Sequence, residues 1–173
     1  MGSAGSAGFS AFLMGTRRSA LVLTIAWAIA SCTGASTTPP QPPTEASARV
    51  YLATVVAIVQ TGDLSHLCDL GSGTCRHILA NGDPAAVPRT EPIVVGTRVI
   101  TPTRTPAGAW DVGGRVLELC GRDGLGHLYY SEMLVFSDGS KLTSTVPVYW
   151  LGFRIASSPT TGSEPSPPPC PGI

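Results

Sequence analysis

The sequence predicts an α+β fold, in which N-terminal helices pack on a curved antiparallel sheet of about four strands. Apolar residues recur at helical spacing between Thr44 and Gly82, and β-rich segments follow one another after Pro92. The pair Asp138-Gly139 is a strong signal for a two-residue β-hairpin turn. Helices that precede hairpin-connected strands are typical of the α+β class.

The first expected helix begins after Thr44 and ends at Gly62. Asp63 can cap a short second helix over residues 64–70, and a third helix is expected over residues 74–82, after a Gly-Ser-Gly break. The apolar residues of the first helix recur at spacings that place them on one face: Tyr51, Leu52, Val55, Val56, Ile58 and Val59.

The expected strands are residues 93–103, 115–120, 127–136 and 142–150. If Asp138-Gly139 is the turn, Val135 lies opposite Leu142 and the faces of the last hairpin follow. The segment 121–126, Gly-Arg-Asp-Gly-Leu-Gly, joins two strands with no helix after it. We therefore expect it to be a hairpin loop and not a phosphate-binding loop.

This register places Glu132 on the outer, solvent-facing side of the sheet, together with Glu118, Lys141, Thr143 and Thr145. The two glutamates then pair with Arg98 or Lys141 at the surface instead of forming a buried acid/base pair, and no catalytic residue is predicted. The inner face carries candidate pocket-lining residues, which either shape a ligand site or fill a packed core. They are Tyr129, Ser131, Ser144 and Trp150, with His127 at the start of the strand pointing the same way.

Composition limits the function. The chain has 173 residues, of which only 13% are charged, and eleven basic residues balance eleven acidic ones. This length favours one domain. A neutral chain lacks the basic face that nucleic-acid binding requires, and its low charge also excludes an unfolded chain held open by repulsion.

The N-terminus has the layout of an export signal. Arg17-Arg18 precede an apolar run over residues 21–30. A membrane-spanning helix needs about 20 apolar residues, so this run is too short to span a membrane. Residues 1–31 are therefore expected to be a signal peptide, and a start at Met14 would open this signal directly.

The run ends in Ile29-Ala-Ser-Cys32, which resembles the lipobox of bacterial lipoproteins. The resemblance implies that Cys32 carries diacylglycerol and further acyl chains such as palmitate, on the extracytoplasmic face of the cell membrane. Two or more acyl chains form a stable anchor. The alternative is a freely secreted protein with a chance cysteine after its signal.

Proline-rich segments flank the folded part. Residues 39–43 are Pro-Pro-Gln-Pro-Pro, and residues 157–173 contain six prolines. Such segments favour an extended backbone without a core. We therefore expect a lipidated tether over residues 32–44, a folded domain over residues 45–156 and a disordered tail over residues 157–173.

Four cysteines follow Cys32, and an exported chain favours disulfides between them. Cys68 and Cys75 flank the Gly-Ser-Gly break, so this pair is favoured, with Cys120–Cys170 as the second bridge. A bridge from Cys68 or Cys75 to Cys120 stays open.

His66 and His77 add a symmetrical two-His, two-Cys set to the first pair of cysteines. The one-residue spacing between each His and Cys is unusual for zinc, and no metal site is predicted.

The order of elements resembles the nuclear transport factor 2-like, cystatin-like cone fold, and more narrowly a group of small actinomycete lipoproteins. The stretches that carry the resemblance are residues 61–64, 67–75, 132–139 and 147–150. It implies a long first helix across a curved sheet, without an agreed activity or a cofactor.

These observations favour a surface lipoprotein that acts as a binding or interaction module. Its expected partners are the membrane, through the lipid anchor, and an envelope protein or a small apolar ligand. The alternative is a small SnoaL-like enzyme, an isomerase, cyclase or hydrolase, that uses the interior of the cone. An ionisable group in an open interior would favour the enzyme, whereas an exposed apolar patch would favour a partner protein.

Overall fold

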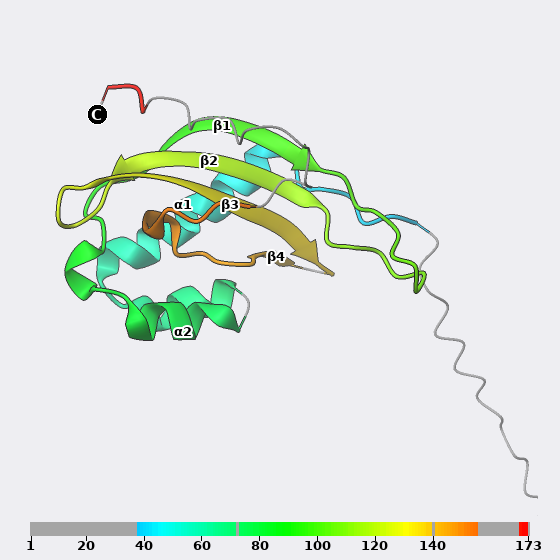
Figure 1. Cartoon of the computed structure of the whole chain (residues 1–173), viewed down its shortest axis with the longest axis horizontal. Coiled ribbons are helices and arrows are strands. Elements are labelled where there is room, and N and C mark those ends of the chain that lie inside the picture. The colour runs from blue at the N-terminus through cyan, green and yellow to red at the C-terminus, as the bar shows by residue number, and fades with distance from the viewer. Residues whose placement is uncertain (1–37, 72, 140, 156–169, 173) are drawn as a thin grey trace, which may run out of the picture. The chain divides into compact units, whose positions relative to one another are not determined.

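The computed structural model describes residues 38–71, 73–139, 141–155 and 170–172, and it has the predicted α+β architecture (Figure 1). Helices precede a curved, open antiparallel sheet of four strands in the order β1-β2-β3-β4. The predicted signal peptide, residues 1–31, and the predicted lipidation site Cys32 lie outside the described residues.

Helix α1 (Glu45–Thr61) begins and ends as predicted. The Thr44 side chain accepts a hydrogen bond from the Ser47 N–H at 3.2 Å, which satisfies one of the free donors of the first turn. The helix ends because Gly62 adopts the left-handed conformation, with φ of 77°. The predicted apolar face is the buried one, except that Ala48 is also buried and Ile58 is only partly buried. The buried residues are Ala48, Tyr51, Leu52, Val55, Val56 and Val59.

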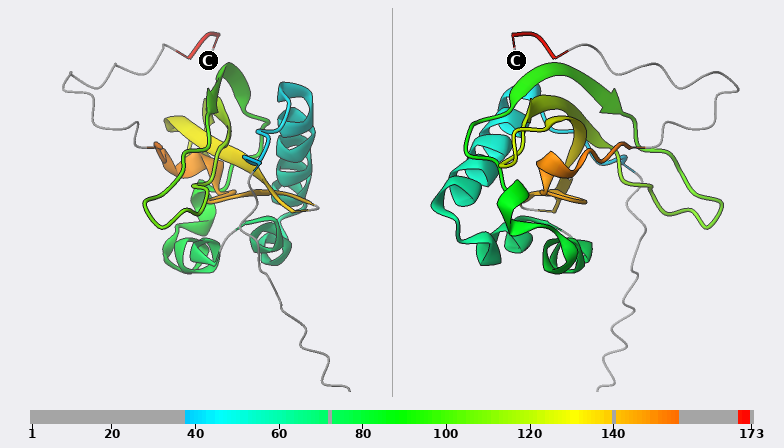
Figure 2. Two further views of the ribbon diagram at one scale, coloured as in Figure 1. Left: turned by 90° about the vertical axis from the view of Figure 1, so that its right-hand side faces the viewer. Right: turned by 60° about the vertical axis from the view of Figure 1, so that its left-hand side comes forward.

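Three short helices follow α1. Asp63 caps the predicted short helix, which is the 3-10 helix η1 (Leu64–Leu70). Helix α2 (Thr74–Asn81) and the 3-10 helix η2 (Pro84–Ala86) then lead to the sheet. Figure 2 shows these helices curling around one side of the sheet, which forms the inner face.

The strands are β1 (Ile93–Ile100), β2 (Gly114–Arg122), β3 (Leu128–Asp138) and β4 (Lys141–Ser144). Strand β4 ends six residues before the predicted end at Trp150. Pro147 cannot donate to a strand ladder, and Tyr149–Leu151 form the 3-10 helix η3.

The register of the last hairpin differs from the prediction. Asp138 pairs with Lys141, so the turn begins at Gly139 instead of Asp138, and Val135 lies opposite Ser144 instead of Leu142. The physical reason is the turn itself: Gly139 has a φ of 64°, which suits the first central position of a hairpin turn, a conformation that costs an aspartate more.

Two further segments lie outside the helices and strands. Residues 101–113 form a ribbon that projects from the end where β1 finishes and β2 begins, with an antiparallel bridge between Arg104 and Trp110 (Figure 1). Residues 153–155 lie along the edge of β3, because the Phe153 carbonyl accepts the Glu132 N–H at 2.7 Å.

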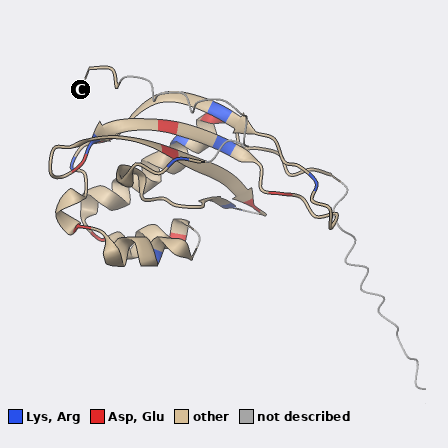
Figure 3. Ribbon diagram, viewed as in Figure 1, with Lys and Arg blue, Asp and Glu red and all other residues tan. Residues whose placement is uncertain are grey.

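Charged residues are spread over the sheet and the helices. Figure 3 shows that basic and acidic positions are not separated into regions of one sign.

Candidate functional site

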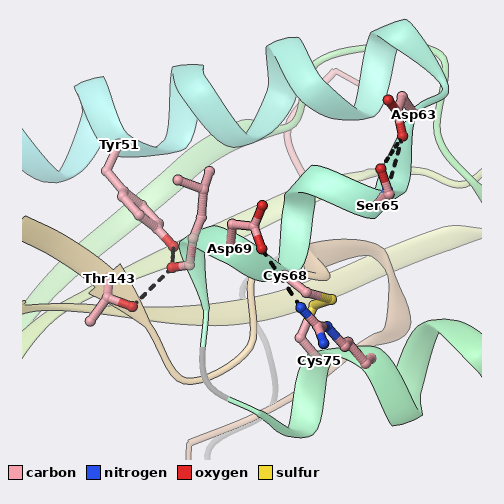
Figure 4. The surroundings of a disulfide bond; sticks show 9 residues. Tyr51, Asp63, Ser65, Cys68, Asp69, Cys75 and Thr143 are labelled. Carbon is pink, nitrogen blue, oxygen red and sulfur yellow. Dashed lines mark hydrogen bonds and ion pairs between the residues drawn. A yellow bond between two sulfur atoms is a disulfide. The ribbon is translucent and has the colours of Figure 1, made fainter. Parts of the chain in front are cut away.

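Two disulfides hold the described chain together, and both favoured pairings are confirmed. Cys68–Cys75 joins η1 to α2 with a Cα–Cα distance of 5.4 Å (Figure 4). Cys120–Cys170 joins β2 to the C-terminal residues with a Cα–Cα distance of 5.6 Å. The open alternative, a bridge from the first pair to Cys120, is therefore wrong. Zinc binding by the two-His, two-Cys set is excluded as well, because both sulfur atoms are bonded to each other.

A shared carbonyl connects the first disulfide region to the core. The Leu70 carbonyl oxygen accepts hydrogen bonds from the Tyr51 hydroxyl at 2.6 Å and the Thr143 hydroxyl at 2.9 Å (Figure 4). Thr143 is 8% exposed, so the prediction that it faces the solvent is wrong. Burial raises the pKa of the Tyr51 hydroxyl, so it serves as a neutral donor.

The four inner-face candidates are buried. Their exposed fractions are 7% for Tyr129, 1% for Ser131, 0% for Ser144 and 5% for Trp150. The Tyr149 ring lies between two of them, with centroids 6.0 Å from Tyr129 and 5.2 Å from Trp150. These side chains fill the inner face, and the buried polar residues in the described part of the chain are two serines and a threonine, with no carboxylate or imidazole.

The fifth candidate, His127, lies elsewhere than expected. Its side chain is 74% exposed, and Nδ1 lies 3.2 Å from Oδ2 of Asp123, within the β2–β3 loop. Its placement follows from the loop, because Asp123 Oδ1 accepts the N–H groups of Leu125 and His127 and turns the chain outward. Partial dehydration alone would raise the pKa of Asp123, but these hydrogen bonds and the nearby imidazole outweigh that effect and lower it.

The outer face carries an ionic cluster. Arg98 Nη2 lies 2.9 Å from Glu132 Oε2, and Arg98 Nε lies 3.9 Å from Glu118 Oε1. The predicted pairing is present, but Glu132 is not in open solvent: its side chain is 13% exposed and also accepts the Ile155 N–H at 2.9 Å. The sequence prediction missed this cover because residues 153–155 are far from Glu132 in sequence.

An open cleft lies at the end of the sheet where β2 finishes and β3 begins. We call it the distal cleft; its volume is about 380 Å³. Its charged lining residues are Arg89, Glu91, Arg122 and Asp123, two of each sign. The other lining residues are Thr90, Ile93, Gly121, Gly124 and Gly126.

The floor of the distal cleft is fixed by backbone contacts. The Gly124 N–H donates to the Ala86 carbonyl at 3.0 Å, and a Cβ at position 124 would collide with the carbonyl oxygen of Ala85. The Arg122 guanidinium donates to the Gly126 carbonyl at 2.8 Å, across the loop. The segment 121–126 is therefore the hairpin loop that the sequence predicted, docked on η2.

Exposed aliphatic side chains gather at this same end of the sheet. Ile93 is 41% exposed, Leu125 49% and Leu128 55%. Leu128 lies opposite Arg122 in the β2–β3 ladder, and Ile93 lines the distal cleft. We call these three side chains the distal rim. Arg122 and Leu128 both point to the outer face; the loop residue Leu125 was not singled out by the sequence because glycines surround it.

The described residues contain no group of three or more His, Cys, Asp or Glu side chains placed to hold a metal ion. Within the same residues, no helix has the length and apolar character to cross a membrane. No protein-family model matches this chain, and no match was found among curated proteins or solved structures.

Proposed function

We propose that this chain is a lipid-anchored binding module on the extracytoplasmic face of an actinomycete cell membrane. In this proposal Cys32 carries the acyl chains, residues 32–44 are the tether, and a nuclear transport factor 2-like domain docks onto an envelope protein. The two disulfides support an exported location, because such bridges persist in oxidising compartments.

The observation that carries the binding role is the contrast between the two candidate surfaces. The four candidate pocket residues of the inner face are at most 7% exposed, whereas the distal cleft is open and bordered by three exposed aliphatic residues. Apolar side chains around a patch of mixed charge suit a protein partner, because the apolar groups provide affinity and the charges fix orientation. An enzyme that uses a carboxylate or an imidazole inside the cone would need such a group there, and the buried residues that the structure describes include neither.

Cys32→Ala tests the anchor. The unsubstituted protein should partition into detergent and membranes, and the variant should appear in the medium or remain unprocessed. A variant that stays in the membrane fraction with the normal mature mass would refute lipidation at Cys32.

Substitution of the distal rim tests the docking role. We expect Leu125→Ser combined with Leu128→Ser to convert a detergent-extracted assembly on native gels into the free protein. Val50→Ser is the matched control, because Val50 is 68% exposed on α1 and lies outside the rim. Loss of the assembly in both variants, or in neither, would contradict docking through the distal end.

A further inference from the structure

The ribbon 101–113 has the composition of a surface that contacts something. The Arg104 guanidinium carbon lies 5.5 Å from the centroid of the Trp110 ring, in a cation–π arrangement. Val112 is 53% exposed, and Pro106 and Ala107 at the tip are exposed. A ribbon that needed only to connect β1 to β2 would not require a tryptophan and an exposed valine.

The ribbon is held in one conformation. Backbone hydrogen bonds join Thr105 N–H to the Ala109 carbonyl at 2.8 Å and Asp111 N–H to the Thr103 carbonyl at 2.7 Å. The Thr103 hydroxyl also donates to the Asp111 carboxylate at 3.2 Å. These bonds present Trp110 in a preorganised way, which lowers the entropy lost on contact.

The predicted tether meets the domain at the base of this ribbon. Arg115, at the start of β2, donates from Nε to the Pro43 carbonyl at 2.9 Å, and the Thr97 hydroxyl lies 3.2 Å from Oε2 of Glu45. Residues 43–45 are therefore fixed where β1 ends and β2 begins. Figure 1 shows the described residues before α1 leaving the sheet at the end from which the ribbon projects.

The tether is long enough for the ribbon to reach the membrane. Eleven residue steps separate Cys32 from Pro43, which is held on the domain, so the tether spans at most about 38 Å. The five steps from Ile100 to Thr105 extend the ribbon by about 17 Å beyond the sheet. A tether anchored by a lipid on Cys32 would thus allow the ribbon to reach the same bilayer.

We infer that the ribbon 101–113 rests on the membrane surface, with Trp110 in the headgroup region and Arg104 at the level of the phosphates. The inference rests on the proposed lipidation of Cys32. Tryptophan rings favour the membrane–water interface, and arginine keeps its charged end in water while its stem lies along apolar groups. Arg104 and Asp111 balance in charge within the ribbon, so contact depends on interfacial burial and not on anionic lipid.

Trp110 provides its own reporter. Of the three tryptophans, Trp27 lies in the predicted signal peptide, so the Trp150→Phe variant of the lipidated protein emits from Trp110 alone. We would incorporate this variant into phosphatidylcholine vesicles whose acyl chains carry bromine near the headgroup end. The expected result is a loss of Trp110 emission that grows with the fraction of brominated lipid.

Matched variants assign the quenching to the ribbon. The Trp110→Phe variant, which retains the buried Trp150, should lose no emission in the same vesicles. If Trp150→Phe does not fold, the difference in quenching between the unsubstituted protein and Trp110→Phe gives the same measurement. Val112→Ser should weaken the quenching of Trp110, whereas Val50→Ser, an exposed valine on α1, should leave it unchanged.

Flotation of the vesicles separates the inference from the proposal on which it rests. Protein that floats with the vesicles while Trp110 keeps its full emission would overturn the ribbon contact and leave the anchor intact. Protein that stays behind would overturn the anchor and the ribbon contact together. Quenching that requires anionic lipid would overturn the interfacial mechanism in favour of charge attraction.

Discussion

Glu132→Gln measures how firmly the C-terminal segment is held on the outer face. The carboxylate is 13% exposed and accepts from both Arg98 and the Ile155 N–H at 2.9 Å. An exposed ion pair contributes about 0.2–1 kcal/mol, whereas a hydrogen bond to a charged group contributes about 1.5–3 kcal/mol. Glutamine keeps one oxygen acceptor and nearly the same side-chain volume, and Arg98 can turn toward Glu118. Because these features limit the loss, we expect the free energy of unfolding to fall by about 1–2 kcal/mol.

The assay is urea unfolding followed by far-ultraviolet circular dichroism, which does not depend on Trp150, with the disulfides intact and the salt concentration fixed. Glu91→Gln is the control, because Glu91 is exposed and its loss should change stability by no more than about 0.5 kcal/mol. Hydrogen exchange of the Ile155 amide should also accelerate in Glu132→Gln. Equal effects of the two substitutions would mean that the segment after Phe153 does not cover the carboxylate.

Trp150→Ala calibrates the same measurement. Trp150 is 5% exposed within the core, and removing a buried aromatic side chain costs about 3–5 kcal/mol because a cavity remains. If Glu132→Gln cost more than Trp150→Ala, the carboxylate would lie in the core and the faces of the sheet would be exchanged. A buried glutamate would then favour the enzyme alternative.

Two further predictions concern the disulfides and the β2–β3 loop. Alkylation without reduction should leave Cys68, Cys75, Cys120 and Cys170 unmodified. Loss of the Cys120–Cys170 bridge, which closes a separation of 50 residues, should lower the free energy of unfolding by about 4 kcal/mol. Loss of Cys68–Cys75, with a separation of 7, should lower it by about 2.5 kcal/mol. The reverse order would contradict an origin of this stabilisation in loop entropy. The lowered pKa of Asp123 means that its charge stabilises the fold above the ordinary value of 3.8, and that this contribution is lost as pH falls through the lower folded pKa. Asp123→Asn should therefore reduce stability at neutral pH and flatten the acid limb of the stability profile, whereas an unchanged acid limb would contradict it.

Local signals made helix α1 predictable. Its cap, its apolar spacing and the glycine that ends it all lie within residues 44–62, so no distant contact was needed to find them. The last strand failed for the opposite reason. Val148, Tyr149 and Trp150 are all at most 5% exposed, and they are buried through distant partners, such as Tyr129 against the Tyr149 ring, which a local sequence pattern does not reveal.

The hairpin register was wrong, yet the faces were right. Moving the start of the turn from Asp138 to Gly139 shifts the partner of Val135 from Leu142 to Ser144, which is two residues. Because side chains alternate with a period of two, such a shift leaves each residue on its own face. The outer position of Glu132 therefore survived an incorrect turn, and a shift of one residue would have reversed it.

The cover over Glu132 has a signal in the sequence itself. Cys120 and Glu118 are two residues apart on β2 and share the outer face. A Cys120–Cys170 bridge therefore requires the C-terminal chain to return to the outer face, close to Glu132 on the neighbouring strand. The predicted disulfide and the prediction of a solvent-facing glutamate thus conflict with each other, and the disulfide is the one that holds.

Strand β2 links the two proposals through geometry. Its nine residues span roughly 30 Å, with the ribbon and the start of α1 at the Gly114 end and the distal cleft at the Arg122 end. If Cys32 is lipidated and the ribbon touches the bilayer, β2 is held at both its base and its ribbon, and the distal rim is carried roughly 30 Å away from the membrane. Loss of ribbon contact in Trp110→Phe with Val112→Ser should then leave the anchor intact but free the domain to tilt. We expect docking through Leu125 and Leu128 to weaken in that variant, although the rim itself is unchanged. Unchanged docking would show that the rim binds independently of the orientation of the domain.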